Sequence, residues 1–154
     1  MKIAIIRTDR MGDMVLTLPI IKGMKVHNTS MEIDVYSSNR NLKIVNNFKY
    51  IHKVINVDNS KLKKREYDLI FNFTPGWKSF FLTLMLKAKT KSTLIYKSRY
   101  NNKFFSKFLI ILLSKIFFQH VLVIDRIKKF KLNQKIHQTE MMLELIKKNN
   151  IPIE

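Results

Sequence analysis

Residues 7–13 read Arg-Thr-Asp-Arg-Met-Gly-Asp and place two guanidinium groups, a hydroxyl, a glycine and a carboxylate next to a predicted helix start. Asp13 could accept a proton from a substrate hydroxyl. Arg7 and Arg10 are suited to bind phosphate or carboxylate groups. Gly12 lets the backbone turn sharply or approach a ligand closely. The alternative is that Asp13 only caps the helix that follows.

Two later segments are candidates for ligand binding. Residues 74–78 (Thr-Pro-Gly-Trp-Lys) end in Trp77 and Lys78, which could contact a sugar or a phosphate. The alternative for this segment is a turn anchored by the tryptophan. Residues 97–103 interleave aromatic and basic side chains, as proteins that bind single-stranded nucleic acid do. Such patches are common in lysine-rich proteins, so this one does not identify a ligand.

Nucleotide fingerprints and metal sites are not expected. The chain has three glycines, which cannot supply a G-x-G-x-x-G or a Walker A motif. Apart from His137 and Glu140, the four histidines show no close ligand spacing with acidic residues. That pair alone is more often a solvated helix start than a metal site. There is no cysteine, so no disulfide framework or thiolate metal site is expected.

The hydrophobic pattern predicts strands that alternate with helices. Strands are predicted at residues 2–6, 32–36, 52–57, 68–73, 93–96 and 121–124, and helices at residues 14–26, 42–47, 78–87, 102–118 and 138–148. Residues 7–13 are predicted to form a polar loop, and Pro19 to make the first helix irregular. This order is typical of an α/β fold with a doubly wound, mostly parallel sheet. Because ligands bind beyond the carboxyl ends of such strands, residues 7–13 and 74–78 are expected at one edge.

The charge of the chain calls for an anionic partner. Its 154 residues include 29 Lys and Arg against 11 Asp and Glu, for a net charge of +18. Residues 1–77 carry 13 basic and 7 acidic groups, and residues 78–154 carry 16 and 4. The more basic half also holds the apolar runs at 80–86 and 104–124, which suits a membrane surface at least as well as nucleic acid. An AT-rich genome, which favours lysine codons, is an alternative cause of the charge.

No targeting or spanning segment is predicted. The apolar run at the N-terminus is too short for a signal peptide. Residues 104–124 are long enough to span a membrane, but Lys107, Lys115, Gln119 and His120 interrupt the run. This stretch is therefore expected to form a buried or interfacial helix followed by a strand, in a cytoplasmic protein.

Residues 2–19 (Lys-Ile-Ala-Ile-Ile-Arg-Thr-Asp-Arg-Met-Gly-Asp-Met-Val-Leu-Thr-Leu-Pro) resemble the opening of glycosyltransferase family 9, the lipopolysaccharide heptosyltransferases. Three later segments follow in the expected order. Residues 32–36 resemble the second strand of the family, and residues 67–70 (Tyr-Asp-Leu-Ile) its fourth strand. Residues 136–140 (Ile-His-Gln-Thr-Glu), running on to Ile151 and Pro152, resemble the helix that closes the N-terminal domain.

The resemblance implies the Rossmann-like N-terminal half of a GT-B enzyme, which transfers a sugar with inversion and without a metal ion. The N-terminal domain takes a lipid-linked acceptor, and the C-terminal domain binds a nucleotide sugar of the ADP-heptose type; no further cofactor is implied. Asp13 is the expected general base. The residues assigned to the substrate are Arg7, Thr8, Arg10, Met11, Gly12, Gly76 and Lys78. The family often has an Asp and a Gln-Gly pair where this chain has residues 72–76 (Asn-Phe-Thr-Pro-Gly), so acceptor contacts from that loop are expected to differ.

The resemblance covers the whole chain but only half of the enzyme. Residues 1–154 are therefore expected to form one acceptor-side domain, inactive alone, for which a separate chain could supply the donor domain. The implied acceptor is a phosphorylated glycolipid of the lipopolysaccharide core, at the cytoplasmic face of the inner membrane. A cationic, apolar surface would dock there. The alternative function is a non-catalytic basic module that binds an anionic membrane surface or nucleic acid. Nucleic acid is not the expected partner, because no recognised nucleic-acid-binding motif occurs.

Overall fold

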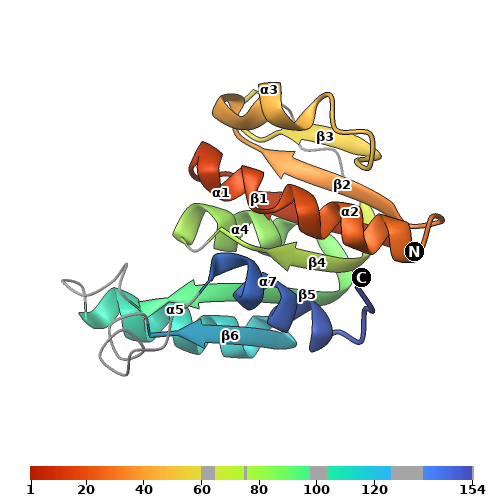
Figure 1. The fold of residues 1–154 in the computed structure, drawn as a ribbon. Coiled ribbons are helices and arrows are strands. Elements are labelled where there is room, and N and C mark those ends of the chain that lie inside the picture. Colours follow the sequence, from red (N-terminus) through yellow and green to blue (C-terminus); the bar gives the residue numbers. More distant parts are fainter. Residues whose placement is uncertain (60–64, 75, 98–103, 126–136, 154) are drawn as a thin grey trace.

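The computed structural model describes residues 1–59, 65–74, 76–97, 104–125 and 137–153, and its centre is a six-stranded sheet (Figure 1). The strands are β1 (Lys2–Arg7), β2 (Glu32–Ser37), β3 (Lys53–Asn56), β4 (Glu66–Asn72), β5 (Lys87–Tyr96) and β6 (His120–Ile124). Their order across the sheet is β3-β2-β1-β4-β5-β6, and every neighbouring pair is parallel. The chain thus winds outward in both directions from β1, which confirms the predicted α/β, doubly wound sheet.

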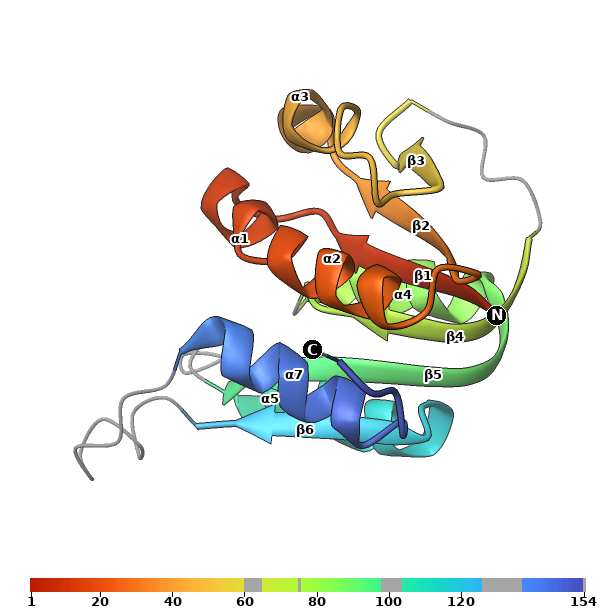
Figure 2. The same ribbon diagram turned by 45° about the vertical axis from the view of Figure 1, so that its right-hand side comes forward.

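Helices cover both faces of the sheet (Figures 1 and 2). The helices are α1 (Met11–Val15), α2 (Leu18–His27), α3 (Leu42–Val45), α4 (Trp77–Met85), α5 (Phe104–Phe117) and α7 (Gln138–Lys147), with a 3-10 turn at Asn39–Asn41. Helices α1, α2 and α7 lie on one face, and α4 and α5 on the other (Figure 2). Parallel sheets are normally buried in this way, because each crossover lays a helix on a face.

The core follows the alternation of side chains along the central strand. Ile3 and Ile5 of β1 pack in the cluster that includes α2 and α7, whereas Ala4 and Ile6 point to the opposite face. All four side chains are fully buried, so β1 is covered on both sides. This explains why its sequence is continuously apolar rather than alternating. It also places the end of β1, and the segment that follows, at the middle of the sheet edge.

Several element boundaries differ from the sequence prediction, and the larger differences lie after β1 and around β5. Arg7 belongs to β1, and α1 begins at Met11, so the loop predicted at residues 7–13 is shorter. The helix predicted at residues 14–26 is split into α1 and α2, with Pro19 in the first turn of α2, where a missing N–H costs nothing.

Two further differences lie around β5. Helix α4 ends at Met85 instead of residue 87, and β5 begins at Lys87 instead of residue 93. Its first residues alternate lysine with small side chains, which is an unusual strand sequence. They pair with β4, where Lys87 and Lys89 form ion pairs with Glu66 and Asp68.

Two further features bear on the sequence predictions. The predicted helix start at His137 and Glu140 is confirmed: Nδ1 of His137 accepts a hydrogen bond from the Thr139 amide, and Glu140 accepts one from the His137 amide. This capping box stabilises the N-terminus of α7. In the part of the chain that the structure describes, no helix has both the length and the apolar content needed to cross a membrane.

Candidate active site at the carboxyl edge of the sheet

Arg7, the last residue of β1, is the buried centre of the site, with 0% of its side chain exposed. Its Nε donates a hydrogen bond to the backbone carbonyl of Asp13 (3.2 Å) and lies 3.3 Å from a carboxylate oxygen of Asp9. Its Nη2 lies 3.5 Å from Oδ1 of Asp13, and its Nη1 donates to the backbone carbonyl of Phe73. Burying a charge is costly unless it is paired and hydrogen-bonded. Arg7 meets this condition and ties the segment after β1 to the end of β4.

Asp13 lies in the first turn of α1, with 20% of its side chain exposed. Its backbone carbonyl accepts hydrogen bonds from Arg7 and from the Thr17 hydroxyl (2.8 Å), so the position of this residue is fixed. The N-cap residue of α1 is Arg10, and no side chain caps this helix. The interpretation of Asp13 as a helix cap is therefore wrong. Its carboxylate is held beside a buried cation and still reaches solvent.

The segment after β4 joins the site, as the sequence predicts. The backbone N–H of Thr8 donates to Oγ1 of Thr74 (2.8 Å), which also lies 3.5 Å from Oδ1 of Asp9. Trp77 turns away from this contact: its Nε1 donates to Oγ of Ser106 in α5 (2.9 Å), and its ring packs against Phe80 and Phe81. Trp77 is thus an anchor between α4 and α5, which was the alternative to sugar binding.

A pocket of about 450 Å³ opens at the carboxyl ends of β1, β2 and β3. It is lined by Thr8, Asp9, Arg10, Ser38, Asn39, Arg40 and Asp58. Arg10 and Arg40 are exposed. Asp13 is not among the lining residues, but the Arg7 guanidinium lies next to both Asp9, which lines the pocket, and Asp13. The volume lies in the range of small-molecule sites.

Sequence reasoning missed the part of this pocket that follows β2 and β3. The Asn39 amide donates to a carboxylate oxygen of Asp58 (2.8 Å), and the Asn56 side-chain amide donates to Oδ1 of Asn39 (2.6 Å). The buried Asn41 donates to the backbone carbonyl of Asp9 (3.2 Å), which links this loop to the one after β1. The rule that ligands bind beyond strand ends would have found Ser38 and Arg40 if it had been applied to every strand.

A second groove continues from this pocket along α4. It shares Thr8, Ser38 and Asp58 with the first pocket, and it also contains Lys78, Phe81 and Met85. Lys78 is therefore next to the site, although it lies on α4.

The remaining predicted residues line neither of these two cavities. Met11 and Gly12 are exposed at the start of α1, and Gly76 is the N-cap residue of α4. No neighbouring atom lies within 4 Å of a Cβ built on Gly12, so space alone does not require glycine there. Of the basic segment at residues 97–103, only Lys97 lies within the described residues; it forms an ion pair with Asp125 (3.8 Å). Among the residues that the structure describes, no three His, Asp or Glu side chains gather as metal ligands.

A second charged cluster lies toward the amino ends of the strands. Asp34 of β2, only 4% exposed, lies 2.9 Å from Nδ1 of His52 and accepts hydrogen bonds from Arg65 (3.2 Å) and the Tyr67 hydroxyl (2.9 Å). The Tyr67 hydroxyl also lies 3.0 Å from that of Tyr36. Burial, followed by the hydrogen bond with Tyr36, raises the pKa of Tyr67 far above the ordinary value of tyrosine.

Comparisons with known proteins support the resemblance seen in the sequence. No family model matches the chain. The sequence is 29% identical over 104 residues to lipopolysaccharide heptosyltransferase 3 of Escherichia coli, an alignment that covers 57% of this chain and 31% of that protein.

Solved structures match nearly the whole chain. A glycosyl transferase of family 9 from Veillonella parvula matches with a TM-score of 0.70 and 14% identity, covering 98% of this chain and 42% of that one. The E. coli heptosyltransferase WaaC with ADP matches with a TM-score of 0.68 and 20% identity, covering 96% and 46%. The chain thus spans less than half the length of these relatives. It has the glycosyltransferase family 9, heptosyltransferase-like fold and corresponds to one half of such a GT-B protein.

Proposed function

We propose that the chain is the acceptor-side domain of a family 9 glycosyltransferase. In this role it would help to transfer a sugar from a nucleotide sugar of the ADP-heptose type to a phosphorylated acceptor of the lipopolysaccharide core. The observation that carries the proposal is the partly exposed Asp13 carboxylate, held by the buried Arg7 beside an open pocket. The relatives named above, which are heptosyltransferases or family 9 transferases, support the class of reaction.

Asp13 would act as the general base. As an acceptor hydroxyl attacks the anomeric carbon of the donor, its proton passes to the Asp13 carboxylate. A bond forms between the hydroxyl oxygen and the anomeric carbon, and the bond from that carbon to the diphosphate breaks. The diphosphate leaves with the electron pair, and the anomeric centre is inverted. Arg7 is fully buried, so we assign it to positioning the carboxylate and not to contacting the sugar.

The acceptor would lie in the pocket beside Asp13. Arg10 and Arg40 present exposed guanidinium groups, which suit the phosphates of the acceptor. Thr8 and Ser38 offer hydroxyls to its sugar ring, and Lys78 faces the adjoining groove. Met11 and Gly12 in the first turn of α1, and Gly76 at the N-cap of α4, would offer backbone groups to the ligand.

The donor would be bound by a second domain. The chain covers between 42% and 50% of the family 9 and WaaC structures that match nearly all of its residues. We assign the remainder of a GT-B enzyme to a nucleotide-sugar domain. That domain would belong to the same polypeptide or to a separate chain. We expect residues 1–154 alone to show negligible transfer, because a closed cleft is needed to exclude water and align the attack.

Binding of the acceptor tests the proposal directly. The ¹⁵N-labelled chain would be titrated with a soluble phosphorylated core oligosaccharide and, as a control, with its dephosphorylated form. We expect amide shifts at residues 8–13 and 38–40 with the phosphorylated ligand, and weaker binding after Arg40→Gln. The matched variant Arg65→Gln removes a guanidinium from the opposite end of the sheet and is expected to bind like the wild type. Equal response to both ligands, or shifts confined to other regions, would contradict the assignment.

A further inference from the structure

Helix α5 exposes an apolar stripe on the side that faces away from the sheet. Phe105, Phe108, Leu112 and Ile116 are between 42% and 76% exposed. Their spacing of three, four and four residues places them on one side of a helix. The opposite side of α5 is buried at Ile110 and Ser114. The stripe therefore does not belong to the core of the sheet, and contiguous exposed apolar surface of this kind marks an interaction site.

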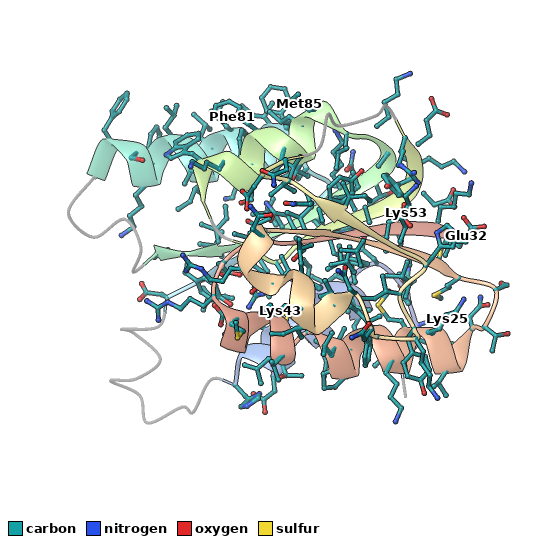
Figure 3. The ribbon with its side chains drawn as sticks, turned by 90° about the horizontal axis from the view of Figure 1, so that it is seen from above. Lys25, Glu32, Lys43, Lys53, Phe81 and Met85 are labelled. Carbon is teal, nitrogen blue, oxygen red and sulfur yellow. The ribbon has the colours of Figure 1, made fainter. Side chains whose placement is uncertain are left out.

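Helix α4 extends the stripe. Phe81 is 55% and Met85 72% exposed, one turn apart on the outer side of α4 (Figure 3). The two helices are joined by the hydrogen bond from Trp77 to Ser106, and Phe80 of α4 also contacts Phe118, the residue directly after α5. We call the six exposed residues the α4–α5 apolar face; they are Phe81, Met85, Phe105, Phe108, Leu112 and Ile116.

Positive charge accompanies this face. Lys78 on α4 is one turn from Phe81, and Lys115 on α5 lies beside the stripe; neither forms an ion pair with any residue that the structure describes. No Asp or Glu occurs anywhere from residue 69 to residue 124. By contrast, Lys87 and Lys89 at the amino end of β5 are paired with acidic residues of β4. The lysines near the apolar face thus keep their charge available for an anionic partner.

We propose that the α4–α5 apolar face docks on an anionic lipid bilayer. Its aromatic and aliphatic side chains would enter the boundary between headgroups and acyl chains, and the lysines would contact lipid phosphates. A protein partner fits less well, because lysine is depleted from protein–protein interfaces. A second copy of the chain also fits less well, since a two-fold contact would bring the same lysines together.

The face leads into the candidate site. Phe81 and Met85 border the groove that also contains Thr8, Ser38 and Asp58, and these three residues line the pocket next to Asp13. A bilayer bound at α4 and α5 would therefore deliver a lipid-linked acceptor along this groove. This connection rests on the proposed function, whereas binding of the bilayer itself does not.

Vesicle sedimentation of the 154-residue chain tests the inference. Vesicles of phosphatidylcholine with phosphatidylglycerol are compared with vesicles of phosphatidylcholine alone. We expect binding to the anionic vesicles that is at least about tenfold tighter than to the neutral ones, because each lysine near the surface contributes about fivefold. The double variant Phe108→Ser/Ile116→Ser is expected to lose at least about tenfold in affinity, since it removes two side chains that enter the bilayer.

Matched controls separate the face from the overall charge. Lys78→Gln/Lys115→Gln should weaken binding about 25-fold, at about fivefold per charge. The same change at Lys22 and Lys43, which are exposed on α2 and α3, should have a much smaller effect. Val26→Ser on α2 is the control for loss of an exposed apolar side chain. All substitutions are at exposed or half-buried positions, and circular dichroism checks that each variant is folded.

Three results would overturn the inference. These are equal binding to neutral and anionic vesicles, an equal loss in the control variants, and no binding to either vesicle. If the chain instead dimerises and Phe108→Ser/Ile116→Ser dissociates the dimer without affecting vesicles, the face binds a second copy. The acceptor titration uses a ligand without lipid, so failure of the transferase proposal is seen independently of vesicle binding.

Discussion

Each end of the sheet carries a cluster in which an arginine pairs with an aspartate. The two clusters differ in which of these two side chains is exposed to solvent. Toward the amino ends, the carboxylate of Asp34 is buried and shared by His52, Arg65 and Tyr67. At the carboxyl edge the cation Arg7 is buried, while the carboxylate of Asp13 is partly exposed. Among the described residues the Asp13 carboxylate pairs with Arg7, and it is less enclosed than that of Asp34.

This difference separates a structural acid from a candidate base. Both oxygens of Asp34 are occupied by protein groups, so little capacity remains for a ligand, and the network joins β2 to the residues flanking β3 and β4. Asp13 is fixed through its backbone carbonyl, and its carboxylate keeps room for a substrate hydroxyl. A buried charge alone therefore does not mark the site; an accessible acid beside a buried cation does.

The largest expected effect is on the rate of sugar transfer, and it distinguishes Asp13 from Asp34. With a donor domain present, Asp13→Asn should lower the rate of sugar transfer by about 10²–10⁴, the usual contribution of a general base. The unfolding free energy should fall less than for Asp34→Asn, because the backbone contacts of residue 13 remain and Asp9 still pairs with Arg7. The measurement is transfer from ADP-heptose to a phosphorylated core acceptor.

The matched control is Asp34→Asn, which changes the same group at the other end of the sheet. We expect its transfer rate to stay near that of the wild type at a temperature where the protein is folded. Equal losses of rate in the two variants would mean that the effect is structural, and the assignment of Asp13 as the base would be abandoned.

The next effect is on stability and concerns Arg7, the buried cation that lies beside the Asp13 carboxylate. Arg7→Met removes the charge that compensates Asp9 and leaves the Phe73 carbonyl without this donor. Removing one partner of a buried ion pair typically costs about 3–5 kcal/mol of unfolding free energy. Urea unfolding of the chain measures this loss directly. A loss below about 1 kcal/mol would show that Arg7 is not the centre of the carboxyl edge.

The elements around these clusters were largely predictable from the sequence. Continuous apolar runs identified β1, and alternation of strands with helices predicted a doubly wound sheet, because parallel strands require crossovers. The start of β5 was missed because residues 87–92 are half lysine, and their strand conformation depends on pairing with β4. Local pattern could not show this pairing.

The site was predictable only in part. The rule about strand ends located Arg7, Thr8, Arg10 and Asp13 correctly at one edge. It did not show that Arg7 is buried, because this follows from the register that sets Ile6 of β1 beside Asn72 of β4 and so brings Phe73 close. Ser38, Asn39 and Arg40 look like any polar turn, and only the packing of β2 and β3 beside β1 makes them part of a pocket.

A smaller effect is expected when the buried acid loses its charge. Asp34→Asn keeps an acceptor oxygen but weakens the hydrogen bonds from Arg65 and Tyr67. We expect a loss of about 2 kcal/mol of unfolding free energy, as for hydrogen bonds to charged groups. Chemical denaturation of this variant and of Asp13→Asn in parallel is the check. A larger loss for Asp13→Asn would reverse the comparison between the two ends of the sheet.

The smallest effect is a pH dependence of the unfolding free energy. Of the two clusters, only the one around Asp34 and Tyr67 should show it. Because burial and Tyr36 raise the pKa of Tyr67, the folded chain keeps this proton above pH 10, where the unfolded chain releases it. The resulting stability is complete below about pH 10 and falls as the pH rises, by about 1.4 kcal/mol at pH 11. Tyr67→Phe has no such proton, so its unfolding free energy should fall less steeply between pH 9 and 11. Parallel curves for the wild type and this variant would show that the Tyr67 hydroxyl is not held protonated by the cluster.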